Sequence, residues 1–99
     1  MTTPVDYDTL LTRILTEPTT ASLLLEEMAD QLAKEPHLYV GESTLTWAER
    51  WAYTTLCEQF PEAVVEDAAD RATQHIPPPH HQETGDTYAL RLRLAARGL

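Results

Sequence analysis

Prolines and isolated glycines divide this chain of 99 residues into five short segments. The breaks are Pro18, Pro36, Gly41, Pro61, the run 77–79 and Gly85. A proline lacks the backbone N–H that a helix needs, and it disfavours helical geometry in the residue before it. Every helix must therefore fit between two neighbouring breaks, which points to several short elements that share one core.

Apolar residues recur at helical spacing in the first four segments. The spacing predicts amphipathic helices over about 6–16, 20–35, 46–60 and 61–76. In the third, Thr46 and Glu49 form a capping-box pattern, which predicts that this helix begins at Thr46. The expected buried stripes are Tyr7, Leu10, Leu11, Ile14 and Leu15; Ala21, Leu24, Leu25, Met28, Ala29 and Leu32; Leu45, Ala52, Leu56 and Phe60; and Val64, Val65, Ala68, Ala69, Ala72 and Ile76.

The last segment, 86–99, fits two patterns. Its alanines, leucines and arginines favour a helix. Its leucines also alternate with other residues over 88–94, as in a strand whose partner would be 38–40. Residues 77–85 form a linker rich in proline and histidine. The sequence therefore predicts one all-α domain over 1–99, a bundle of four to five short helices with or without a minor two-stranded ribbon.

Charge narrows the classes of partner. The chain has 16 acidic and 7 basic residues, for a formal charge of −9. Direct binding to nucleic acid depends on basic side chains that neutralise phosphates, and anionic membranes attract the same side chains. We therefore expect neither ligand, and we expect a protein partner with a basic surface.

Composition also bears on compartment and chemistry. A single cysteine, Cys57, excludes an internal disulfide, and the N-terminus lacks the pattern of a signal peptide. We expect a cytoplasmic protein, and the excess of arginine over lysine favours a bacterial or phage genome. The glycines stand alone, and neither serine lies in a nucleophile motif. The sequence therefore predicts no catalytic residue and no cofactor.

Acidic side chains cluster on two predicted helices. Glu62, Glu66 and Asp70 follow one another at helical spacing with Asp67 beside them, and such like-charge neighbours repel. A second group on 20–35 consists of Glu26, Glu27 and Asp30. These residues have two interpretations, either a docking face for a basic partner or a solvated surface that keeps the protein soluble.

Two aromatic residues lie off the core stripe of the third helix. Trp47 and Trp51 are one helical turn apart. They have two interpretations, an exposed anchor for a partner or a second packed face. Because a small domain needs its aromatic side chains inside, burial is favoured.

Histidines flank the proline run. His75, His80 and His81 could supply zinc ligands, but their spacing matches no common zinc arrangement, so the favoured interpretation is a polar linker that binds no metal.

The functional hypothesis is a non-enzymatic acidic interaction module, such as a small inhibitor or regulator, in its sharpest form a phage-type mimic of nucleic acid. The alternatives are a small metal- or ligand-binding domain around these histidines and a structural subunit of a homo-oligomer that buries Trp47 and Trp51.

Overall fold

The computed structural model describes residues 19–99, and this part of the chain is an all-α bundle. Its four helices are α2 (Thr20–Ala33), α3 (Glu42–Cys57), α4 (Glu62–Thr73) and α5 (Gly85–Arg97). The helix predicted over 6–16 lies outside the described residues. No helix within 19–99 combines the length and the apolar character needed to cross a membrane.

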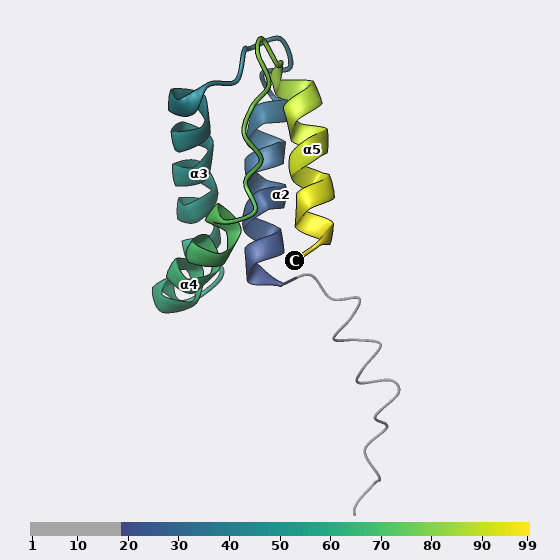
Figure 1. Cartoon of the computed structure of the whole chain (residues 1–99). Coiled ribbons are helices and arrows are strands. Elements are labelled where there is room, and N and C mark those ends of the chain that lie inside the picture. Colours follow the sequence, from purple (N-terminus) through teal and green to yellow (C-terminus); the bar gives the residue numbers. More distant parts are fainter. Residues whose placement is uncertain (1–18) are drawn as a thin grey trace, which may run out of the picture.

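Helix α2 is the centre of the bundle, because α3, α4 and α5 all pack against it (Figure 1). Thr19 caps its first turn, where the side-chain oxygen accepts a hydrogen bond from the Ser22 N–H at 3.1 Å. Its predicted apolar stripe is buried throughout, and four of its large side chains have no exposed surface: Leu24, Leu25, Met28 and Leu32. Complete burial of such a side chain contributes about 1.5–3 kcal/mol.

The helices around α2 present mainly alanines to it. The buried residues include Ala48 and Ala52 of α3, and Ala68 and Ala72 of α4. Small side chains allow helix axes to approach closely, so three helices can surround one. The largest buried side chain is that of Tyr88 in α5.

Two predictions for α3 and α4 were wrong. Helix α3 begins at Glu42, not at Thr46, and the Thr44 hydroxyl accepts a hydrogen bond from the Gly41 N–H at 3.3 Å. In α4, Val64 is exposed although it was placed in the buried stripe. It lines an open groove between the start of α2 and α4, and Val65 is the valine that enters the core.

The last segment is helical, as its propensity favoured, so the ribbon between 38–40 and 88–94 does not form. Residues 38–40 instead pair with the end of the linker through a single antiparallel bridge between Tyr39 and Thr84. The Val40 N–H donates to the Glu83 carbonyl at 2.8 Å, and the Gly85 N–H donates to the Leu38 carbonyl at 2.9 Å. The linker runs from the end of α4 along the bundle to this bridge (Figure 1).

Candidate functional site

The acidic residues predicted on the fourth helix lie on the surface of α4. Glu62, Glu66 and Asp70 are all exposed, and we call these three residues the acidic face. None of the three has an ion-pair or hydrogen-bond partner among the side chains of residues 19–99. Their neighbour Asp67 differs, because it pairs with Arg71 one turn later at 3.2 Å. The acidic face is therefore an array of exposed negative charges with no counter-charge in the described part of the chain.

The acidic face borders the contact between α3 and α4. Thr73 of α4 donates a hydrogen bond to the Ala69 carbonyl, and its hydroxyl also lies 3.4 Å from the Glu49 carboxylate of α3. Tyr53 of α3 lies close to Glu62 and Glu66. Desolvation raises the pKa of its phenol, and Cys57 and the two carboxylates raise it further. The surface therefore combines carboxylates from α4 with a phenol and a carboxylate from α3.

The acidic residues of α2 are in a different situation. Arg93 of α5 lies 3.1 Å from the Asp30 carboxylate and 4.0 Å from the Glu26 carboxylate. Glu27 accepts a hydrogen bond from the Gln31 side-chain amide at 3.3 Å. The structure thus gives each of these three predicted partner-binding residues an intramolecular partner. Among the acidic residues predicted to bind a partner, those without a partner inside the described part of the molecule are the three residues of the acidic face on α4.

The tryptophans are exposed, contrary to the burial that we favoured. Trp47 is 41% exposed and Trp51 is 50% exposed. The reason is that α3 turns Ala48, Ala52 and Leu56 towards α2, so the side that carries the tryptophans faces outwards. Both side chains border a shallow groove of about 270 Å³ whose other walls are Arg50 and Thr54.

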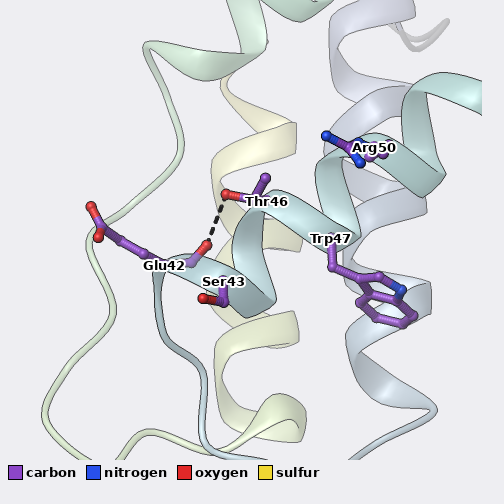
Figure 2. A pocket seen from close by; sticks show the side chains of 5 residues that line it. All are labelled: Glu42, Ser43, Thr46, Trp47 and Arg50. Atoms are coloured by element: carbon purple, nitrogen blue, oxygen red, sulfur yellow. Dashed lines mark hydrogen bonds between the residues drawn. The ribbon is translucent and has the colours of Figure 1, made fainter.

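A second open groove, of about 630 Å³, continues along the same helix towards its N-terminus. Figure 2 shows its lining residues following one another along α3, with the Trp47 ring extending away from the helix backbone. The Thr46 hydroxyl donates to the Glu42 carbonyl at 2.9 Å, so this hydroxyl is engaged by its own helix. The lining residues are Glu42, Ser43, Thr46, Trp47 and Arg50.

The three histidines do not gather into a metal site. His75, His80 and His81 are exposed, and no group of three or more His, Cys, Asp or Glu side chains within residues 19–99 has a geometry suited to a metal ion. The backbone N–H of His80 donates to the Glu83 carboxylate at 2.9 Å, which shapes the end of the linker. Cys57 is half-buried at the end of α3.

Sequence reasoning missed the cluster that fastens the linker to α5. The side chain of Glu83 is almost fully buried and pairs with Arg91. Arg91 also donates to the Pro78 carbonyl and lies over the Tyr88 ring, with its guanidinium carbon 5.7 Å from the ring centroid. The Tyr88 hydroxyl donates to the Pro77 carbonyl, and burial raises the pKa of Tyr88 to about 12. No sequence motif joins these residues, because the pairing depends on how the linker returns along the bundle.

Searches against protein-family models, curated proteins and solved structures find no match to this chain.

Proposed function

We propose that this protein is a non-enzymatic interaction module that binds a basic surface of another protein through the acidic face of α4. The observation that carries the proposal is the contrast between two acidic groups. Every predicted acidic residue of α2 has a partner within the molecule, whereas Glu62, Glu66 and Asp70 have none among residues 19–99. Like charges one turn apart destabilise the helix that carries them. These three residues therefore do not serve stability, which favours a role in binding.

The chemistry of the acidic face suits a groove rich in lysine and arginine. Along α4, residues one turn apart have Cβ atoms about 5–6 Å from each other, so the carboxylates form a row of closely spaced charges. A row of negative charges on a rigid helix can occupy a site that normally holds a phosphate backbone, which is the sharper form of the proposal. On this reading the protein is a small cytoplasmic inhibitor or regulator, and association is fast at low salt and weakens as salt screens the charges.

The test is affinity capture from nuclease-treated lysate of the native host with matched charge variants as bait. Glu62→Lys/Glu66→Lys reverses two charges of the acidic face. Glu35→Lys/Glu42→Lys reverses two exposed charges outside α4. Each replacement adds two units, so both variants go from −9 to −5. We expect wild type and the second variant to retain the same basic protein at low salt and release it at high salt, and the first variant to lose it.

The outcomes separate three cases. Loss of the partner with both variants would mean that binding depends on the net charge of the protein and not on the acidic face, which would contradict the proposal. Retention with both variants would exclude α4 as the binding surface. Competition between the captured complex and added nucleic acid would support the mimic, and a captured partner that does not bind nucleic acid would exclude it.

A further inference from the structure

The outer face of α3 is a second surface with the composition of a binding site, because it exposes two tryptophans. We call it the tryptophan face and define it by Ser43, Thr46, Trp47, Arg50, Trp51 and Thr54. Its two indoles leave about half of their surface exposed. Tryptophan is the residue most enriched among side chains that dominate interface energies. Both tryptophans of the chain lie on this one face, so its apolar surface is concentrated.

Charge distinguishes the tryptophan face from the rest of the molecule. Arg50 is the only charged residue in the set, and one carboxylate borders it at each end of the helix, Glu42 at the start and Glu58 at the C-cap. The tryptophan face itself therefore holds no acidic residue, in a protein with a formal charge of −9. Two copies of such a protein repel each other along most of their surfaces. In the middle of this face, around Trp47 and Arg50, two copies can approach with no carboxylate in the contact.

The positions along α3 suit a pair of helices. Residues 43, 47, 50 and 54 recur at spacings of four, three and four, which is the pattern of a helix that packs along another helix. Arg50 makes no ion pair within residues 19–99, and the cation–π contact found in that range involves Arg91 and Tyr88. The guanidinium of Arg50 is therefore available to a second molecule.

Symmetry selects the orientation of the pair. In a two-fold interface, a contact between residue i of the first copy and residue j of the second is repeated between residue j of the first copy and residue i of the second. A parallel pair of α3 helices would place Arg50 against Arg50. An antiparallel pair centred between residues 48 and 49 places Arg50 of each copy against Trp47 of the other. That arrangement supplies two cation–π contacts, and it places residue 46 opposite 51 and residue 43 opposite 54.

We infer that the tryptophan face is the interface of a homodimer, formed by antiparallel packing of α3 from two copies. The exposed parts of four indoles amount to an area on the order of 450 Å², taking roughly 250 Å² for one side chain. With the flanking residues, this lies at the small end of specific interfaces, below about 1,200 Å². Interfaces of this size are typical of weak, transient contacts, so we expect an equilibrium between monomer and dimer at concentrations on the order of micromolar or above.

The experiment is sedimentation velocity of the full chain from low to high micromolar concentration, combined with tryptophan emission over the same range. Because both tryptophans lie on the proposed interface, emission reports directly on its burial. We expect a monomer–dimer equilibrium and a shift of emission to shorter wavelength as the dimer forms. Arg50→Glu should weaken the dimer about tenfold or more, and so should Trp47→Ser.

The matched control is Leu90→Ser/Leu94→Ser, which removes an apolar pair from α5 that is even more exposed than the two tryptophans. We expect this variant to dimerise like wild type, and circular dichroism of each variant checks that the helices are intact. A monomer at every concentration would overturn the inference. So would a dimer that survives Trp47→Ser and Arg50→Glu, or a monomer whose indoles already emit as buried groups. None of these results affects capture through the acidic face, which lies on α4.

Discussion

The charged residues on the two sides of α2 differ in whether they form ion pairs. On the side of α5, Arg91 pairs with the buried Glu83, and Arg93 lies between Glu26 and Asp30. On the side of α4, Glu62, Glu66 and Asp70 stand exposed with no counter-charge among residues 19–99. Both sides are rich in ionisable residues, so composition does not distinguish them. The difference indicates that paired charges contribute to the fold on the α5 side, and it supports the proposal that the unpaired charges on the α4 side bind a partner.

The largest effect is expected where the paired charge is buried. In Arg91→Ala, the Glu83 carboxylate stays in the interior with only the His80 N–H as a donor. Removing one member of a buried pair costs about 3 kcal/mol or more. Arg93→Ala is the matched control, because its pairs lie near the surface and are worth less than about 1 kcal/mol. Urea denaturation followed by circular dichroism measures both losses, and equal losses would contradict the assignment of Arg91.

The junction between α2 and α5 should be nearly as sensitive. A side chain at Gly85 would place its first carbon 2.4 Å from the Glu35 carbonyl oxygen and 2.6 Å from that of Leu32. Both neighbours are backbone atoms, so Gly85→Ala must displace the start of α5, at a cost of about 2 kcal/mol. Gly41→Ala is the control, because nothing lies within 4 Å there. A shift of the thermal midpoint no larger for Gly85→Ala than for Gly41→Ala would show that the junction is loosely packed.

A pH effect is expected from Tyr88. Its pKa rises from 10.0 to about 12 on folding, mainly through burial. The folded state holds the proton of Tyr88 more tightly than the unfolded state does. The contribution of Tyr88 to the free energy of unfolding is therefore fully present below pH 10 and is lost as the pH rises towards 12. The loss is about 2–3 kcal/mol. Tyr88→Phe should cost about 1 kcal/mol at neutral pH through the missing hydrogen bond to Pro77.

Unfolding measured from pH 8 to 12 separates these contributions. We expect the alkaline loss of stability to shrink in Tyr88→Phe and to persist in Tyr39→Phe, whose ring is exposed. An alkaline profile unchanged by Tyr88→Phe would mean that the phenol does not fasten the linker.

The smallest effect is expected on the acidic face, and its sign is reversed. Glu66 lies one turn from both Glu62 and Asp70, so Glu66→Lys replaces two repulsions with two attractions. Each repulsion that is lost and each attraction that is gained contributes a few tenths of a kcal/mol, for a total gain of about 1 kcal/mol at low salt. Glu35→Lys, outside any helix, is the control. A loss of stability in Glu66→Lys would show that this carboxylate supports the fold and would remove the contrast between the two sides.

Secondary structure was largely predictable because its signals are local. The stripe from Ala21 to Leu32 is buried as its spacing indicates, and the prolines mark where helices end. The start of α3 was misplaced because the capping-box pattern at Thr46 competed with an equally helical stretch from Glu42. The strand alternation of 88–94 did not decide the last segment, since helix propensity and burial of Tyr88, Ala89 and Leu92 agree on one helix.

The sequence by itself determined an acidic chain of short amphipathic helices, because proline breaks and apolar periodicity act within a few residues. Tertiary structure decided which apolar side of α3 is buried. Close packing around α2 favours Ala48 and Ala52 over the bulky indoles, and that choice left Trp47 and Trp51 exposed. It also decided which carboxylates are neutralised. Asp30 pairs with Arg93, which is far away in the sequence, so the sequence alone does not predict this ion pair.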